Sequence, residues 1–255
     1  MASAKEIVVK VIPSKIANAF VRKHHYSGKV VNSSRLHFGA FIKGVLHGVL
    51  SYGSPMVKRN MLGMVEGTLW NEMLELNRMA FDDMLPRFSE SRCIAISIRL
   101  IKKQAPQIKW ILSFADGCQC GDGTIYRASG FYLTAIKENN SLYRLPDGRV
   151  VNNLVMTGKS MLTDLRERTD ISSAWSYNKN AKILGARPIK GYQLRYIYLI
   201  DKSCKLTVPI MPFSEIEKRG AKMYLGKRPG GVESCTVSSQ DKGGGAKPTP
   251  GLNYA

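Results

Sequence analysis

The 255-residue sequence has few cysteines, few acidic residues and no long apolar run. Its five cysteines are odd in number and scattered, which argues against a disulfide framework and favours a reducing compartment. No apolar run approaches the roughly 18 residues of a membrane-spanning helix, and Met1–Glu6 lacks the basic and then apolar layout of a signal peptide. We therefore expect a cytoplasmic protein with no membrane partner.

Several nucleotide-binding and metal-binding motifs are also missing. No strand is followed by G-x-G-x-x-G, and no G-x-x-x-x-G-K-[ST] occurs, so a Rossmann dinucleotide site and a P-loop are poorly supported. The D/N-P-P-[YF] motif typical of adenine methyltransferases is absent. Cys118 and Cys120 lie too close for a zinc knuckle, and no second pair accompanies them.

Acidic residues number 19 against 38 lysines and arginines, giving a net charge of +19. The excess lies in the flanks: residues 1–35 carry +6 and residues 156–235 carry +8, whereas residues 36–155 carry only +4. Such a charge favours a polyanion, and we expect nucleic acid as the partner, with an anionic membrane surface as the second candidate. The alternative is that the cations only keep the protein soluble. The candidate phosphate contacts are Lys179, Lys182, Arg187 and Lys190.

Hydrophobic periodicity predicts an α/β protein with a mixed central sheet and flanking helices. Strands are expected at residues 7–12, 36–42, 45–52, 74–81, 108–115, 131–137 and 192–200. Helices are expected from Ser14, which would act as the N-cap, and at residues 89–104, 124–129 and 161–168. The helix at 89–104 would cross over between strands 74–81 and 108–115, with an inward stripe centred on Cys93, Ile96 and Leu100 and widened by Ile94, Ile98 and Ile101.

The predicted organisation is one catalytic domain over residues 1–225. Its basic part, residues 156–225, would contact DNA. Residues 226–255 are rich in Gly, Pro, Ser and Lys and are expected to form a flexible tail.

Polar residues stand at two strand positions where a core would not need them. Asn77 and Arg78 lie inside a predicted strand, where the arginine would either clamp a carboxylate or phosphate or protect a sheet edge. Asp116 follows a buried strand, a place where ligands gather in α/β sheets, and is either a catalytic carboxylate or part of a turn before Gly117. Tyr126 comes ten residues later and could supply a phenol.

Two helix ends carry further candidates. His25 closes the first predicted helix and is either a general base or metal ligand, or a histidine placed favourably for the helix dipole. Ser89, Ser91 and Arg92 open the crossover helix, where they would either bind an anion or only cap the helix.

Five stretches resemble the Mom family of phage DNA-modification proteins: HHYSGK, SYGSP, LNRM, SESR and FADGxxxGDGTIYRASGF, between residues 24 and 131. Members of this family resemble GNAT N-acetyltransferases, whose fold has a helix crossover between its fourth and fifth strands. They convert adenine in phage DNA to an N6-carbamoylmethyl derivative, which protects the DNA from host restriction. The resemblance therefore implies double-stranded DNA as the partner and the host cell cytoplasm as the location. By this resemblance the functional residues are His25, Tyr52, Arg78, Ser91, Asp116 and Tyr126.

The resemblance leaves the group donor and the metal open. An iron requirement has been proposed for the family, but this sequence shows no firm ligand set. The loop Asp82–Ser91 has no glycine and carries three acidic residues, which would repel the pyrophosphate of acyl-CoA. An RNA-linked donor, or an activated glycine such as glycyl-tRNA, would fit the positive charge at least as well. A non-catalytic DNA-binding protein and an N-acetyltransferase acting on another substrate remain the alternative functions.

Overall fold

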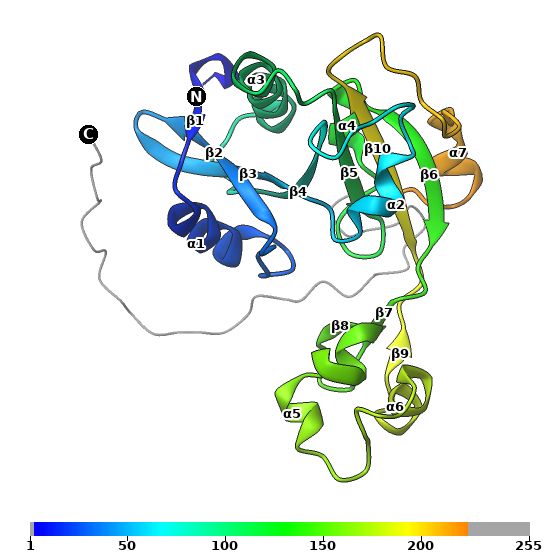
Figure 1. Ribbon diagram of the computed structural model, residues 1–255. Helices are drawn as coiled ribbons and strands as arrows, with labels where there is room; N and C mark the ends of the chain where they lie inside the picture. Colours follow the sequence, from blue (N-terminus) through cyan, green and yellow to red (C-terminus); the bar gives the residue numbers. More distant parts are fainter. Residues whose placement is uncertain (1–2, 224–255) are drawn as a thin grey trace, which may run out of the picture.

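The computed structural model describes residues 3–223, so the predicted tail at 226–255 lies outside the described residues. A seven-stranded sheet forms the centre of the molecule (Figure 1). In spatial order its strands are β1 (Val8–Val11), β2 (Ser34–Ile42), β3 (Val45–Gly53), β4 (Met73–Phe81), β5 (Trp110–Asp116), β10 (Tyr192–Leu199) and β6 (Tyr132–Glu138). Neighbouring strands are antiparallel except β4 and β5, which are parallel.

Helices cover both faces of this sheet. The described residues contain the helices α1 (Ser14–His24), α2 (Lys58–Leu62), α3 (Ser89–Gln104), α4 (Thr124–Ala128), α5 (Thr163–Arg166), α6 (Tyr177–Ile183) and α7 (Ser214–Lys218), with 3-10 turns at Ala4–Glu6, Asn153–Met156 and Gly158–Ser160. Helix α1 packs on β2, β3 and β4, and α3 lies on the opposite side in Figure 1. The structure confirms the predicted mixed sheet with flanking helices and the α3 crossover between β4 and β5.

Local sequence explains most element boundaries. The β2–β3 hairpin turns at Lys43 and Gly44, whose φ angles of 49° and 81° match the positive φ values of a tight hairpin turn. Helix α1 begins as predicted, but its N-cap is Pro13 and not Ser14, and no side chain caps it. Proline fits there because it has no N–H to leave unsatisfied.

The buried side of α3 differs from the prediction. Ile96 and Leu100, which were expected at the centre of the inward stripe, are only partly buried. Ser97 is fully buried in their place, together with Cys93, Ile94, Ile98 and Ile101. A serine is tolerated in this core because its hydroxyl donates to the carbonyl of Ile94 at 2.9 Å, so no polar group is left without a partner.

The sheet opens between β4 and β5. The two strands pair only from Met73 opposite Trp110 to Leu76 opposite Ser113. Asn77 is an extra residue at this point, because the adjacent residues Ser51 and Tyr52 of β3 pair with Arg78 and Leu76. Such a β-bulge bends its strand and redirects side chains. The bulge therefore explains the unusual asparagine in the strand and places it where β4 leaves β5.

Residues 139–191 form a separate small unit between β6 and β10, which we call the insert (Figure 1). It contains a three-stranded sheet of β8 (Val150–Asn152), β7 (Leu142–Arg144) and β9 (Arg187–Pro188), with α5 and α6 beside it. It also has its own apolar core, which includes Met156, Leu165 and Leu184. The predicted basic portion 156–225 therefore spans parts of both units, since β10 belongs to the main sheet.

Candidate active site

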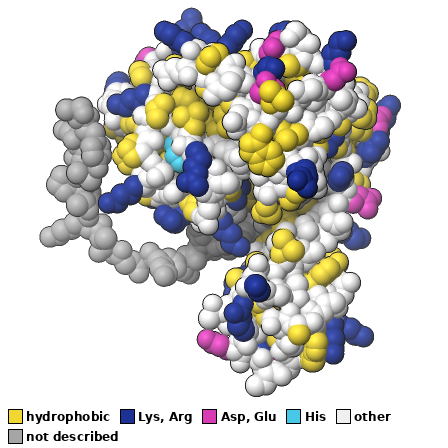
Figure 2. Space-filling view, in the orientation of Figure 1, with side chains coloured by type: hydrophobic (Ala, Val, Ile, Leu, Met, Phe, Trp, Pro, Cys, Tyr) yellow, Lys and Arg dark blue, Asp and Glu magenta, His cyan; other side chains and the backbone are white. Residues whose placement is uncertain are grey.

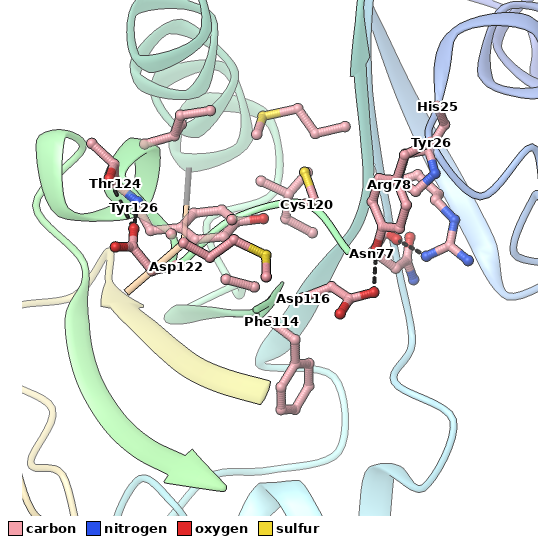
Figure 3. Close-up of a pocket in the computed structure, with 17 residues that line it drawn as sticks. His25, Tyr26, Asn77, Arg78, Phe114, Asp116, Cys120, Asp122, Thr124 and Tyr126 are labelled. Atoms are coloured by element: carbon pink, nitrogen blue, oxygen red, sulfur yellow. Dashed lines mark hydrogen bonds between the residues drawn. The ribbon is translucent and has the colours of Figure 1, made fainter. Parts of the chain in front are cut away.

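A cavity of about 210 Å³ lies where β4 and β5 separate (Figure 3). Four segments line it: the end of α1, residues 76–79 of β4, residues 114–116 of β5 and the glycine-containing turn 120–126. Figure 3 shows His25, Tyr26, Asn77 and Arg78 on one side and Asp122, Thr124 and Tyr126 on the other. We call this cavity the inner pocket. It lies at the carboxyl ends of two parallel strands, where ligands gather in α/β sheets.

Asp116 ends β5 and is held by three donors. Its Oδ2 accepts hydrogen bonds from the Tyr26 hydroxyl at 3.1 Å and from the Gln119 amide at 3.0 Å. Its Oδ1 accepts from the backbone N–H of Cys118 at 2.9 Å. The last contact is the Asx-type turn expected before the glycines, and it leaves the Asp116 carboxylate on the wall of the pocket.

His25 and Tyr26 follow the last turn of α1 and reach the pocket from the opposite side. Their rings lie 4.3 Å apart, and His25 Nδ1 is 2.8 Å from the Ser27 hydroxyl. Burial, with the nearby Arg78 guanidinium, lowers the pKa of His25 to about 4, so the imidazole is neutral near pH 7. Burial and the Asp116 carboxylate raise the pKa of Tyr26, so its hydroxyl remains a donor.

Arg78 provides the fixed positive charge of the pocket. Its Nε donates to the carbonyl of Lys29 at 2.8 Å, and its NH1 group donates to the carbonyl of Asn77 at 2.7 Å. Among residues 3–223 no carboxylate forms an ion pair with this guanidinium. Two backbone carbonyls therefore orient the charge without neutralising it, and it stays available for an anion or a developing oxyanion.

Tyr126 forms the opposite wall on α4. Its ring packs against Tyr196 and Phe131 at centroid distances of 5.2 and 5.3 Å. Burial raises its pKa to about 12, so its phenol is protonated. Helix α4 starts after Gly123, whose φ is +83°, and a Cβ there would lie 2.4 Å from the Tyr196 ring. Glycine is thus required for the close approach of this turn to β10.

The structure brings together His25, Asn77, Arg78, Asp116 and Tyr126, but not the remaining predicted site residues. Tyr52 is fully buried under α3, where its hydroxyl lies 2.7 Å from that of Ser97. It does not line the inner pocket. Its place at the end of a β-hairpin gave no indication that the crossover helix would cover it.

Ser89, Ser91 and Arg92 lie at the start of α3, away from the inner pocket. Ser89 is fully buried, and its hydroxyl caps the carbonyl of Pro86. Ser91 and Arg92 line a second, open cavity of about 420 Å³ together with Lys5 and Arg99. This cavity carries three cationic side chains and no acidic one.

Sequence reasoning missed Tyr26 and Cys120 as pocket residues. Tyr26 touches Asp116 directly and was passed over beside the more conspicuous His25. Cys120 was considered only as a zinc ligand, yet its side chain lines the pocket, where burial raises its pKa to about 11. The adjacency of Tyr26 to the predicted histidine was the available signal.

The resemblance raises two groups that the site could hold, an iron ion and the pyrophosphate of acyl-CoA. Within residues 3–223 no three His, Cys, Asp or Glu side chains converge as metal ligands, so the described residues do not fit an iron centre. The loop before α3 has a left-handed residue, but it is the bulky Phe88 with φ of 68°. Without glycine this loop does not fit a backbone cradle for a pyrophosphate. No helix in the described part of the chain is long and apolar enough to span a membrane.

The sequence matches the Mom protein family over residues 6–215, most of the chain. The chain belongs to the Mom family. It is 36% identical over 154 residues to the protein named "Methylcarbamoylase mom" of Escherichia phage Mu. That alignment covers 60% of this chain and 63% of the phage Mu protein, so this chain matches less than two thirds of that protein's length.

Solved structures similar to this Mom-family chain are N-acetyltransferases. The IAA acetyltransferase of Bacillus cereus matches with a TM-score of 0.40 and 10% identity over 76% of this chain and 99% of its own. A Bacillus subtilis acetyltransferase in complex with CoA matches with a TM-score of 0.39, 10% identity and coverages of 76% and 97%. The GNAT-like fold itself rests on the strand order, the parallel β4–β5 pair and the α3 crossover.

Proposed function

We propose that this protein is a phage DNA-modification enzyme that converts adenine in DNA to N6-carbamoylmethyladenine and so protects the DNA from host restriction. One observation carries the proposal. Three stretches that resemble the Mom family, at residues 24–29, 76–79 and 114–131, are far apart in sequence but line one pocket. The relative named as a methylcarbamoylase supports the chemistry, and the net charge of +19 supports the nucleic-acid substrate.

The substrate base would reach the inner pocket through a groove between the catalytic body and the insert. This outer groove has a volume of about 410 Å³ and shares Tyr26, Arg78 and Asp116 with the inner pocket. Lys29 lines it from the catalytic body, and Arg149 lines it from the insert. An adenine inside a duplex is inaccessible, so the base would be extruded into the pocket while its backbone stays in the groove.

The insert supplies the proposed DNA-contact residues. It contains nine lysines and arginines against four acidic residues. Figure 2 shows such cationic side chains over both the insert and the catalytic body above it. Lys179, Lys182 and Arg187 form no ion pair with a carboxylate of the described chain, and Lys190 completes the predicted set. These cations would contact phosphates and give affinity without sequence readout.

The proposed chemistry begins as acyl transfer. The adenine N6 attacks the carbonyl carbon of a carboxyl-activated glycine, a new N–C bond forms, and the activating group leaves with a proton. The glycyl amine then attacks C6, which closes a five-membered ring. Cleavage of the original C6–N6 bond leaves N6 as the terminal amide and the glycine nitrogen on the ring. All atoms of the product are accounted for, and no oxidant is needed.

The protonation states of the pocket residues suggest a different chemical role for each of them. Asp116 is the proposed acceptor of the N6 proton, because its carboxylate lines both the inner pocket and the outer groove, and the neutral His25 imidazole would assist it. The Arg78 guanidinium would stabilise the oxyanion of the acyl-transfer step. Tyr126 keeps its proton and would act as a donor or stack on the base. Ser91 would contact only a distal part of the donor, since it lines the second cavity.

Expression of the full chain in bacteria tests the function directly. Mass spectrometry of nucleosides from cellular DNA should reveal N6-carbamoylmethyladenine, and the DNA should resist restriction. Asp116→Asn should abolish the modified nucleoside while DNA affinity is retained, whereas the exposed Glu217→Gln control should behave like the wild type. Feeding nitrogen-15 glycine should label the ring-attached nitrogen, and label in the terminal amide alone would rule out the rearrangement. Unmodified DNA from a folded, DNA-binding protein would favour a non-catalytic binding protein.

A further inference from the structure

Asn77 has an amide group without a partner at the wall of the inner pocket. Its side chain is 8% exposed, and its Oδ1 accepts a hydrogen bond from the Ser34 hydroxyl at 2.7 Å. Its Nδ2 is buried and has no acceptor among the described residues. A buried amide donor without a partner costs roughly 1–3 kcal/mol. Because the Ser34 contact fixes the other end of the amide, the Nδ2 donors are held ready for a ligand in the pocket.

Asp116 offers the complementary acceptor. A carboxylate has about four lone-pair positions, and the described donors occupy three of them: two on Oδ2 and one on Oδ1. One position on Oδ1 remains. Asn77 and Asp116 belong to the two strands that separate around the pocket, and both line it (Figure 3). The pocket therefore presents one fixed hydrogen-bond donor and one fixed acceptor.

We propose that Asn77 determines base specificity: its Nδ2 donates to the unprotonated ring nitrogen next to the amino-bearing carbon, while Asp116 Oδ1 accepts from the exocyclic amino group. This inference rests on the proposed function and defines the substrate class of the same site. Adenine and cytosine offer an amino donor beside a ring-nitrogen acceptor. Guanine and thymine offer a keto oxygen at the corresponding position, which would face the Asp116 carboxylate and be repelled.

The geometry also explains why an asparagine stands in this strand. The β-bulge at residue 77 lies where β4 separates from β5, and the Asn77 side chain lines the inner pocket there. The hydroxyl of Ser34, itself buried, then fixes which end of the amide faces the ligand. Arg78 is already tied to two carbonyls and supplies charge. Asn77 can therefore read the base while Arg78 interacts with the transferred group.

The experiment measures binding of the full-length protein to short DNA duplexes in which one target base faces an abasic site, so that extrusion costs little. The target is adenine, 1-deazaadenine, 7-deazaadenine or hypoxanthine, and fluorescence anisotropy gives the dissociation constants. For the wild type we expect 1-deazaadenine to bind about tenfold more weakly than adenine, as for loss of one well-placed hydrogen bond, and 7-deazaadenine to bind within twofold of adenine. We expect hypoxanthine to bind more weakly still.

Two substitutions separate base readout from general affinity. Asn77→Asp keeps the acceptor for Ser34 but removes the donors, and Asn77→Leu removes both while keeping a similar volume. In both variants the deaza penalty should fall below twofold, whatever happens to overall affinity. Ser33→Ala is the matched control, because the Ser33 hydroxyl donates to the carbonyl of Ser54 and does not line the pocket. It should keep the full penalty.

Equal wild-type affinity for adenine and 1-deazaadenine would overturn the assignment, as would a penalty that persists in both Asn77 variants. Absence of any preference for a target base over an abasic site would also overturn it. Failure of the proposed function looks different, because wild-type cellular DNA would then lack the modified adenine. A modified adenine together with unchanged deaza affinities would retain the enzyme and reject the role of Asn77.

Discussion

Glu75 makes the stability of the pocket-forming strand depend on pH in a calculable way. It lies on β4 opposite Gly53 and Leu112, neither of which offers a side-chain donor. Burial raises the pKa of its carboxyl from 4.5 to about 7, and the Arg78 guanidinium acts in the opposite direction without cancelling the effect. The folded protein therefore keeps this carboxyl protonated at pH values where the unfolded chain has already ionised it.

The sign and size of the effect follow from proton linkage. Between pH 4.5 and 7 the unfolded state binds fewer protons than the folded state at this residue, so the free energy of unfolding falls as pH rises. The difference between a pKa of 4.5 in the unfolded chain and about 7 in the folded protein corresponds to about 3 kcal/mol of unfolding free energy, at 1.36 kcal/mol per pKa unit. This decrease in the free energy of unfolding is absent below pH 4.5 and complete above pH 7.

Glu75→Gln isolates this contribution, because glutamine keeps the shape and cannot ionise. In urea unfolding at pH 4, 6 and 8 the variant should match the wild type at pH 4 and exceed its stability by about 3 kcal/mol at pH 8. Glu217→Gln, at an exposed carboxylate paired with Lys222, should change stability by less than about 0.5 kcal/mol at every pH. A stability difference between Glu75→Gln and wild type that stays constant from pH 4 to 8 would refute the reasoning.

Three further predictions follow from the site. The pKa of His25, lowered to about 4, makes wild-type stability fall as pH drops from 6.5 to 4, and His25→Asn should flatten that part of a urea-unfolding profile. Tyr26→Phe removes a donor to Asp116 and should reduce adenine modification about tenfold in a nucleoside assay, with unchanged stability. Tyr52→Phe should leave modification within twofold of wild type but cost about 1 kcal/mol in unfolding, because its hydroxyl bonds to Ser97 in the core.

The sheet could be predicted because its strands have strong local signals. The hairpin at Lys43 and Gly44 and the helix at 89–104 were predicted with correct or nearly correct bounds, since turn residues and helical periodicity are local features, although Phe88 and not Ser89 is the N-cap of α3. It was harder to predict which face of α3 is buried. Its stripe depends on Ser97 finding a partner in Tyr52 on a distant strand, and helical periodicity treats serine as an outward residue.

The insert was not predicted as a unit for a related reason. Its strands are only two or three residues long, too short for the alternation that identifies a strand. Helix α6 was missed as well, because its buried positions include Asn180, which bonds to the carbonyls of Met156 and Ser172. Polar groups satisfied by backbone carbonyls hold this unit together, and hydrophobic patterning does not detect them.

The pocket residues could be proposed individually, but their assembly depends on one irregularity. Asp116 and Tyr126 follow from the general position of ligands at strand ends, whereas Asn77 and Arg78 reach the same space only because β4 contains a bulge and leaves β5 after Leu76. A regular strand would place successive side chains on opposite faces of the sheet. The residue least compatible with strand propensity is thus the one at which the sheet opens to form the inner pocket.

The two basic parts of the chain come together at the outer groove. The basic N-terminal flank and the basic insert are separated in sequence by a nearly balanced stretch. They meet at the groove, where Lys29 lies on one wall and Arg149 on the other. Arg149 is paired with Asp147 and Asp164, so it shapes its wall more than it adds charge. The net positive charge at the mouth thus comes mainly from Lys29 and Arg78, next to Asp116, which would direct a phosphate toward the site without drawing it onto the acceptor carboxylate.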